Sequence, residues 1–330
     1  MKFKSSFPSF KRLHSSVILL SVSLGVFLFS IFFAPLYYDG DQVVYHNAYK
    51  DVAGTELLTG FVSYQFRIST SEPIHFFIVW LANNLGLEKN FFIAIANSFL
   101  AYVTMRVFLQ WRVSVYIALV VIFTNYYVLV LYFAAERLKF AFIFLMLSLL
   151  YIRNHKLSIL FAITSVLTHI QQLIIYGSIM FSWFIENLIY ILSTSRIGSK
   201  KIFLLIGIVF IGLFLFYFQG NQLTYKFWEY YGKATGNSLL VLWKAFSIFL
   251  LTLLYTSNRR KVISIFCIIF ITVFLVGPER VNMIAYFFFM FYALQYKGGV
   301  NLGVLITSFY FGLKSIYFIF QVVTSGQGFG

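Results

Sequence analysis

Charged residues are scarce in this chain, and their scarcity excludes an ordinary soluble protein. Only 11% of the 330 residues are Asp, Glu, Lys or Arg, whereas 61% are hydrophobic and 22% are aromatic. Soluble domains carry roughly 25% charged residues. Apolar runs are separated by short polar breaks, which leave no room for an extramembrane domain. The sequence therefore predicts one integral membrane domain over residues 1–330, an all-α bundle of transmembrane helices.

Cysteine and acidic residues are also few. Because Cys267 is the only cysteine, an intramolecular disulfide is impossible, and cysteine usage does not indicate the compartment. Ten acidic residues stand against 25 Lys and Arg, which gives a formal net charge of +15. In a soluble protein that balance would raise the question of nucleic acid. Here most basic residues occupy turns between apolar runs, so we assign them to membrane topology and anionic lipids, not to nucleic acid.

Several catalytic and cofactor-binding motifs are absent. The sequence has no Walker A loop, no paired Cys/His zinc spacing, no HExxH and no GxSxG. Nucleotide-driven transport, metalloprotease and serine-hydrolase chemistry therefore lack support. Asp39 and Asp41 have the spacing of a metal-binding Asp-x-Asp pair, but a lone pair of this kind in a loop is weak evidence. We predict neither a metal nor a cofactor.

Basic residues predict the topology. A basic N-terminal flank precedes the apolar run 17–36, which is longer than a signal-peptide core and is not followed by a cleavage pattern. We interpret this run as a retained span, with the N-terminus in the cytoplasm. The positive clusters near 153–156, 196–201, 259–261 and 297 are placed inside on the same grounds.

Apolar runs between these turns predict about eleven spans. An odd number of crossings must separate Glu72 outside from Arg153 inside, so one run, Pro73–Leu87, becomes a short outer-leaflet or re-entrant helix. Pro73 suits the first position of such a helix. The polar segments near 37–72 and 219–238 become outer loops. The predicted spans are 17–36, 91–110, 114–134, 138–152, 157–176, 178–192, 202–218, 238–256, 262–276, 283–296 and 300–323.

Ionisable residues within these runs form the candidate site. Such groups cost several kcal/mol in a membrane unless they are paired or face a cavity, so they are functional candidates by default. Counting ~1.5 Å per residue from the inside turns places Arg137, His169 and Arg280 roughly 24, 20 and 26 Å up a core about 30 Å thick. The three converge on a layer near the outer surface, which Glu72 also reaches.

Simpler, structural interpretations of these ionisable residues also stay open. Lys139 lies about two residues deeper than Arg137 on another helix face, and we interpret it as support for Glu136. The side chains of the layer could instead be unrelated anchors that hold helix ends at the interface.

Aromatic residues in the outer loops predict sugar binding. Tyr45 lies in the first loop, and Tyr225, Trp228 and Tyr230 alternate with charged residues in the second. Aromatic rings stack on the apolar faces of pyranoses, while charged neighbours hydrogen-bond the hydroxyls. An aromatic belt at the membrane interface is the alternative.

With these residues placed, the chain resembles the EpsG/Wzy-type bacterial polysaccharide polymerases over most of its length. The shared features are an outer Asp-and-Tyr segment, a Glu-Pro pair before a helix, an Arg that opens a helix with a small residue soon after, a later His, and a late Arg before an aromatic helix. These features are Asp41, Tyr45 and Tyr49; Glu72-Pro73; Arg137 with Ala141; His169; and Pro278-Glu279-Arg280.

The resemblance implies a glycosyltransferase of the bacterial cytoplasmic membrane that joins polyprenyl-diphosphate-linked oligosaccharide repeat units at the outer face. The product would be O-antigen, capsule or exopolysaccharide. Arg137 and Arg280 would clamp the diphosphate, and His169, Glu72 or Asp41 would position or deprotonate the acceptor hydroxyl. Membrane lipids, a flippase and a chain-length regulator are the implied partners.

Two other functions stay open at this point. A flippase for the same lipid-linked sugars would distribute its charges through the membrane and usually has repeated halves, and this sequence shows neither. An O-antigen ligase-like transferase shares the donor chemistry and differs only in the acceptor.

Overall fold

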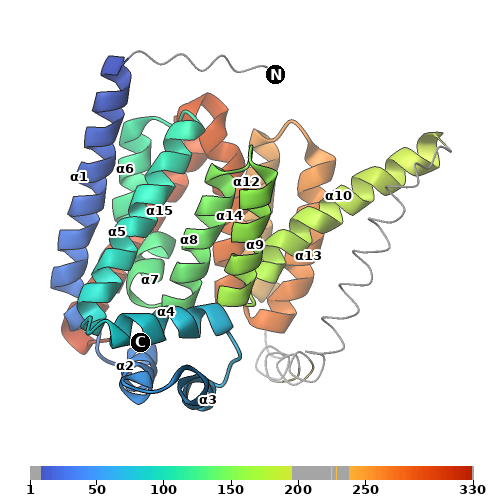
Figure 1. Ribbon diagram of the computed structural model, residues 1–330. Helices are drawn as coiled ribbons and strands as arrows, with labels where there is room; N and C mark the ends of the chain where they lie inside the picture. Colours follow the sequence, from blue (N-terminus) through green and yellow to red (C-terminus); the bar gives the residue numbers. More distant parts are fainter. Residues whose placement is uncertain (1–8, 195–223, 225–227, 229–237, 329–330) are drawn as a thin grey trace. The chain divides into compact units, whose positions relative to one another are not determined.

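The computed structural model describes residues 9–194, 224, 228 and 238–328, and all regular secondary structure among them is helical (Figure 1). The all-α prediction is therefore confirmed for the described part of the chain. The helices divide into two compact units. Unit 1 comprises Met1–Ile170 and Lys297–Gly330, and unit 2 comprises Gln171–Tyr296.

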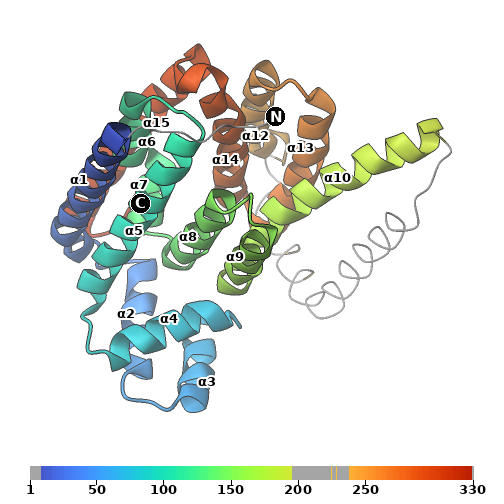
Figure 2. The same cartoon turned by 45° about the horizontal axis from the view of Figure 1, so that its top comes forward.

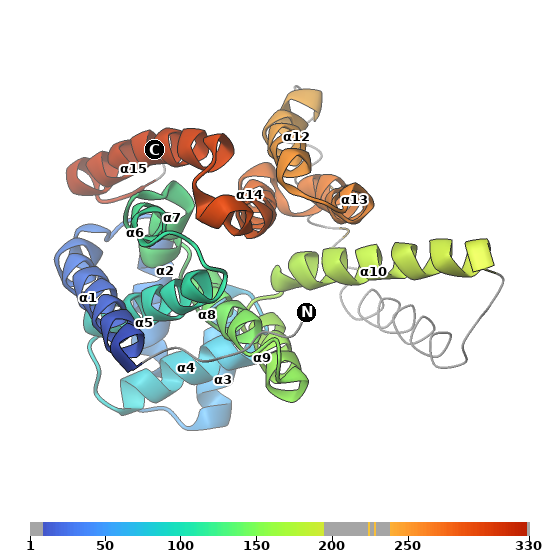
Figure 3. The ribbon, with the colours of Figure 1, turned by 90° about the horizontal axis from the view of Figure 1, so that it is seen from above.

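Unit 1 is a group of upright helices with three short helices across one end. Neighbouring helices α1, α5, α8 and α9 stand side by side, and α2, α3 and α4 lie at their lower ends in Figures 1 and 2. From above, α15 packs along α6 and α7 (Figure 3). The bounds are α1 Ser9–Phe33, α2 Asp41–Val52, α3 Leu57–Ile68, α4 Pro73–Asn84, α5 Lys89–Gln110, α6 Val115–Thr124, α7 Tyr126–Phe133, α8 Glu136–Leu150, α9 His155–Thr168 and α15 Leu302–Ser325.

Unit 2 is built around three mutually packed helices, α12, α13 and α14, and the longer α10 packs against α13. Aromatic rings join α12 to α13, because Phe249 contacts both Phe266 and Phe270 at ring-centroid distances of 5.2 and 5.7 Å. The bounds are α10 Gln172–Thr194, α12 Ser238–Tyr255, α13 Arg259–Val276 and α14 Pro278–Gln295.

In the part of the chain that the structure describes, fewer helices are long and apolar enough to cross a membrane than the apolar runs predict. Four described helices are long and apolar enough, namely Ser15–Leu36, Lys89–Gln110, Gln172–Thr194 and Leu302–Ser325. The pair α6 and α7, bent by 52°, would make a fifth. The prediction of about eleven spans is not supported, since several runs form helices that are too short, such as α8 with 15 residues and α9 with 14. The predicted span 202–218 lies outside the described residues.

Two predicted spans are interrupted. The predicted span 157–176 is wrong because α9 ends at Thr168 and His169 has extended backbone angles, φ −155° and ψ 117°. The predicted span 114–134 breaks at Asn125, whose side-chain oxygen accepts a hydrogen bond from the Tyr127 amide and caps α7. Polar residues inside apolar runs mark both breaks, and hydropathy alone does not detect them.

The polar segment 37–72 folds into two helices where an outer loop was predicted. Helices α2 and α3 pack with α4 around a small apolar core. The first residue of α4 is Pro73, as predicted, and its 12 residues are too few to cross a membrane. The core consists of Ala48, Tyr49, Val52, Tyr64, Phe76 and Val79.

The start of α2 is fastened to the end of α15. The backbone amides of Tyr38 and Asp39 both donate to the Gly326 carbonyl, at 3.1 and 3.0 Å. Gly326 has a φ of +71°, and a Cβ there would collide with the Tyr38 ring. Only glycine fits this position without displacing the ring.

Charge is distributed unevenly along the helices of unit 1. Every acidic residue of this unit falls at the end that carries α2, α3 and α4, which we call the acidic end (Figure 1). The opposite end carries basic turns at α1, after α5, between α8 and α9, and before α15. The acidic residues are Asp39, Asp41, Asp51, Glu56, Glu72, Glu88 and Glu136.

Candidate functional site

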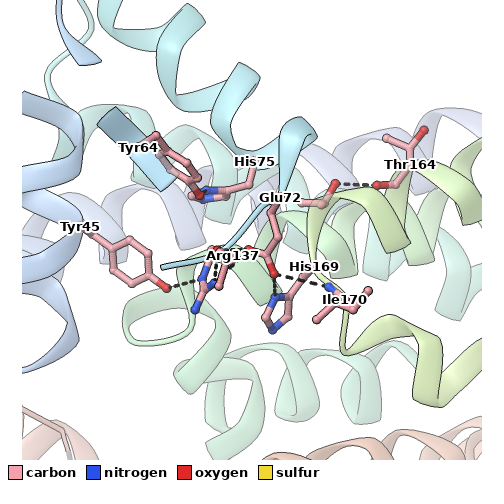
Figure 4. Close-up of polar contacts among 10 residues, drawn as sticks. Tyr45, Tyr64, Glu72, His75, Arg137, Thr164, His169 and Ile170 are labelled. Atoms are coloured by element: carbon pink, nitrogen blue, oxygen red, sulfur yellow. Dashed lines mark hydrogen bonds and ion pairs between the residues drawn. The ribbon is translucent and has the colours of Figure 1, made fainter. Parts of the chain in front are cut away.

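A buried polar cluster lies where α4 meets the end of α9 and the start of α8 (Figure 4). Glu72 immediately precedes Pro73 at the start of α4, Arg137 is the second residue of α8, and His169 follows the last residue of α9. Since α8 and α9 form an antiparallel hairpin, the start of one and the end of the other lie close together. Arg137 and His169 are therefore neighbours, as predicted, while their depth in a membrane stays a prediction.

Glu72 joins the two predicted residues through its two carboxylate oxygens. Its Oε2 accepts a hydrogen bond from Arg137 Nη1 at 3.0 Å, and its Oε1 lies 2.5 Å from His169 Nδ1. The Ile170 amide also donates to Oε1, at 3.4 Å. The carboxylate is 5% exposed, so this pairing offsets the cost of burying its charge.

The Arg137 guanidinium is held on three sides. Its Nη1 donates to Thr70 Oγ1 at 2.9 Å as well as to Glu72, and its Nε donates to the Tyr45 hydroxyl at 3.2 Å. We find no hydrogen-bond partner for Nη2 among the described residues. With five N–H donors in a fixed fork, Arg137 keeps two donors that can bind an anion.

Electrostatics determine the protonation of the pair Glu72–His169. Burial alone would raise the pKa of Glu72, but the hydrogen bond and charge of His169, together with Arg137, lower that pKa to about 2. An ionised carboxylate only accepts hydrogen bonds, so Nδ1 of His169 carries the proton. The basic atom of a neutral His169 is therefore Nε2.

A second buried pair, Tyr64 and His75, lies beside this cluster (Figure 4). The Tyr64 hydroxyl is 2.5 Å from His75 Nδ1, and both side chains are fully buried. Burial lowers the pKa of His75 to about 4, although the negative charges of Glu136 and Glu72 act in the opposite direction. His75 is therefore neutral near pH 7.

Some residues of this region were not found from the sequence. Thr70 and Tyr64 appeared only as parts of a polar loop, and Lys89 fell in the break before the predicted span 91–110. Lys89 lies 3.7 Å from Glu136 and forms an ion pair with it. The buried Lys139, predicted to support Glu136, also interacts favourably with that carboxylate through its charge. A lysine directly before an apolar run, facing a glutamate at the start of another, was the available signal.

Other predicted site residues lie elsewhere. Asp41 is exposed in the first turn of α2, and no hydrogen bond or ion pair links it to the cluster in the described structure. Arg280 is an exposed residue of α14 in unit 2, and its convergence with Arg137 stays a prediction. Trp228 is 67% exposed, while Tyr225 and Tyr230 lie outside the described residues.

The arrangement combines an oriented imidazole with a guanidinium that can bind an anion. Among the described residues, no group of three His, Cys, Asp or Glu side chains is placed to hold a metal ion. No known protein family matches the chain, and neither a curated protein nor a solved structure is detectably similar to it. The resemblance to polysaccharide polymerases therefore stays a prediction.

Proposed function

We propose that the protein is a membrane glycosyltransferase that polymerises polyprenyl-diphosphate-linked oligosaccharide repeat units at the outer face of a bacterial cytoplasmic membrane. The observation that carries the proposal is Glu72, which binds Arg137 with one oxygen and His169 with the other. A base and an anion-binding group are thus fixed to one carboxylate. Transfer of a sugar from a diphosphate to a hydroxyl needs these two groups.

Arg137 binds the diphosphate of the donor in this proposal. Its Nη2 donors face no described partner, and guanidinium N–H groups match the spacing of phosphate oxygens. The interaction strengthens as negative charge develops on the leaving group, so it stabilises the transition state more than the bound donor. Tyr45 and Thr70 hold the guanidinium in place.

His169 acts as the base, and Glu72 orients it. The acceptor hydroxyl oxygen bonds to the anomeric carbon of the donor, while the bond from that carbon to the diphosphate oxygen breaks. Polyprenyl diphosphate leaves with the electron pair, and Nε2 of His169 takes the hydroxyl proton. Glu72 then stabilises the imidazolium. Both oxygens of Glu72 are already engaged and Asp41 is exposed, which favours His169 among the three sequence candidates.

The distribution of charge supports the proposed orientation. Basic turns collect at the end of unit 1 opposite the site, and positive residues are retained on the cytoplasmic side. On this basis we propose that the N-terminus lies in the cytoplasm and the acidic end outside. Arg280 as a second diphosphate ligand, and Tyr225, Trp228 and Tyr230 as sugar contacts, belong to the same proposal. Tyr45 was predicted as a sugar contact, but it is buried and binds Arg137 instead.

Gene deletion with analysis of the cell's polysaccharide bands tests the function. We expect single repeat units on the lipid anchor and no long chains, with recovery on expression of the wild-type gene. Loss of repeat units at the outer face, with accumulation inside, would identify a flippase. Accumulation of unligated polymer would identify a ligase. Unchanged banding would contradict all three functions.

A further inference from the structure

Lys89 is a buried cation that lies outside the Glu72 cluster. It is the first residue of α5, and only 6% of its side chain is exposed. Its ammonium donates to Gln42 Oε1 at 2.7 Å and lies 3.7 Å from Glu136 Oε2. A buried ammonium is costly unless it is paired and hydrogen-bonded, and these two partners satisfy that requirement.

These contacts hold the junction between α7 and α8 from both sides. Gln42 donates its Nε2 to the carbonyl of Phe133, the last residue of α7, at 2.8 Å. Glu136, bound to Lys89, is the first residue of α8. Arg137 follows it directly, so the position of its Cα depends on this turn. The N-cap of α8, Ala135, has no side-chain hydrogen bond that could fix the turn instead.

Lys89 is also connected to the Arg137 guanidinium through the side chain of Tyr45. Its ammonium lies over the rings of Tyr45 and Tyr49, at 5.9 and 5.7 Å from the ring centroids. The hydroxyl of the same Tyr45 accepts the hydrogen bond from Arg137 Nε. Lys89 therefore contacts both the residue before Arg137 in the chain and the ring that holds its side chain.

We propose that Lys89 is a positioning residue, which sets the place of Arg137 through Glu136 and Tyr45. Its effect on catalysis rests on the function proposed above, while its effect on the start of α8 does not. The described contacts of Lys89 include neither Glu72 nor His169, so it acts on the reaction only through Arg137.

The test uses Lys89→Met and the double variant Lys89→Met/Glu136→Leu in the full chain, with Lys50→Met as control. Lys50 is exposed on α2 and forms no ion pair in the described structure. The double variant removes the charges of Lys89 and Glu136 together, so it avoids a lone buried carboxylate. The buried Lys139, whose charge also interacts with Glu136, can become neutral because burial lowers its pKa to about 7. The double variant is therefore expected to fold even if Lys89→Met alone does not.

Hydrogen–deuterium exchange of the peptide over residues 134–140 measures the structural effect. We expect at least tenfold faster exchange in whichever Lys89 variant is folded, and no change in Lys50→Met. Unchanged exchange would overturn the proposal, whatever the activity of the protein. This readout needs no substrate, so it stays decisive if the proposed function fails.

Polymerisation rates in a double-mutant cycle with Arg137→Ala measure the catalytic effect. We expect the folded Lys89 variant to be at least tenfold slower in kcat than wild type, and to cause no further loss when Arg137 is already alanine. Additive losses would overturn the action through Arg137. An Arg137→Ala protein with wild-type polymerisation rates would refute the catalytic role of Arg137, leaving the exchange experiment to decide whether Lys89 positions the start of α8.

Discussion

At the residue scale, the proposed role of Arg137 depends on the shape of its guanidinium. Three of its N–H donors go to Thr70, Glu72 and Tyr45. Lysine would keep the charge but lose the planar fork, because an ammonium binds phosphate as a point charge. The proposed binding of the diphosphate therefore depends on the planar fork of the guanidinium and not on its charge alone.

We therefore expect Arg137→Lys to lose about tenfold to a hundredfold in kcat/KM, and Arg137→Ala to lose more. The measurement is elongation of a purified polyprenyl-diphosphate-linked repeat unit by protein matched for membrane level. Arg106, at the basic end of α5, offers a matched control as Arg106→Lys. Full activity of both Arg137 variants would contradict the assigned role.

Glu72→Gln tests the orienting carboxylate. Glutamine keeps the shape but cannot stabilise the imidazolium that forms on His169, so kcat should fall by about a hundredfold or more. The pH dependence of kcat should change as well, because the basicity of the imidazole depends on its partner. The exposed Glu56, replaced in Glu56→Gln, should leave the profile as it is. A Glu72→Gln profile identical to wild type would rule out the dyad.

His75 predicts a pH dependence of stability. Its pKa is lowered from 6.5 to about 4 in the folded protein, so the unfolded chain binds a proton that the folded chain does not between these values. Stability therefore falls as pH drops from 6.5 to 4, by roughly 3 kcal/mol at most. Thermal unfolding in detergent should show a shallower decline for His75→Gln.

The contribution of Glu72 appears at lower pH. Its pKa lies at about 2 against an ordinary value of 4.5, so its stabilisation is lost only below pH 4.5. The two contributions therefore fall in different pH ranges. If the stability of His75→Gln fell between pH 6.5 and 4 as steeply as that of the wild-type protein, His75 would not be the titrating group.

At the scale of the helices, the sequence identifies most boundaries that carry a polar signal. Pro73 marks the start of α4, and the basic turn at Arg153 separates α8 from α9. This hairpin is enough to predict that Arg137 and His169 lie at one depth. The break at His169 and the bend at Asn125 were missed, because a single polar side chain inside an apolar run barely changes its hydropathy.

The partners of the site residues were harder to predict than their depth. Glu72 was placed in the layer from topology alone, but its contact with both Arg137 and His169 depends on how α4 crosses the hairpin. That crossing is set by long-range packing in the α2–α4 core. No local pattern in the sequence predicts that crossing.

Gly60 tests the packing of α3 on this core. A Cβ at this position would lie 2.5 Å from Thr55 Oγ1 and 3.4 Å from the Trp80 ring, so Gly60→Ala should cost about 1–3 kcal/mol despite its better helix propensity. The matched control is Gly312→Ala in α15, where a Cβ meets nothing within 4 Å. It should be neutral or stabilising by up to about 1 kcal/mol. Equal melting temperatures for the two variants would contradict the tight packing.

At the scale of the whole molecule, the uneven charge of unit 1 predicts its orientation. Single cysteines introduced by Glu56→Cys at the acidic end and Arg153→Cys at the basic end test it in a Cys267→Ser background, which removes the only natural cysteine. Both positions are exposed. A membrane-impermeant maleimide added to intact cells should label the first and not the second. The opposite pattern would reverse the topology.

The link between Gly326 and the start of α2 sets an order of events during synthesis. Tyr38 and Asp39 leave the ribosome long before Gly326, whose carbonyl accepts both of their amides. At ~5–20 residues per second, that acceptor follows roughly 15–60 s later. The residues just before helix α2, which supplies Tyr45 to the guanidinium, can therefore form these two hydrogen bonds only after α15 has been synthesised. Premature termination after Ile170 but before Gly326 would leave a chain that carries every residue of the Glu72 cluster without these two hydrogen bonds.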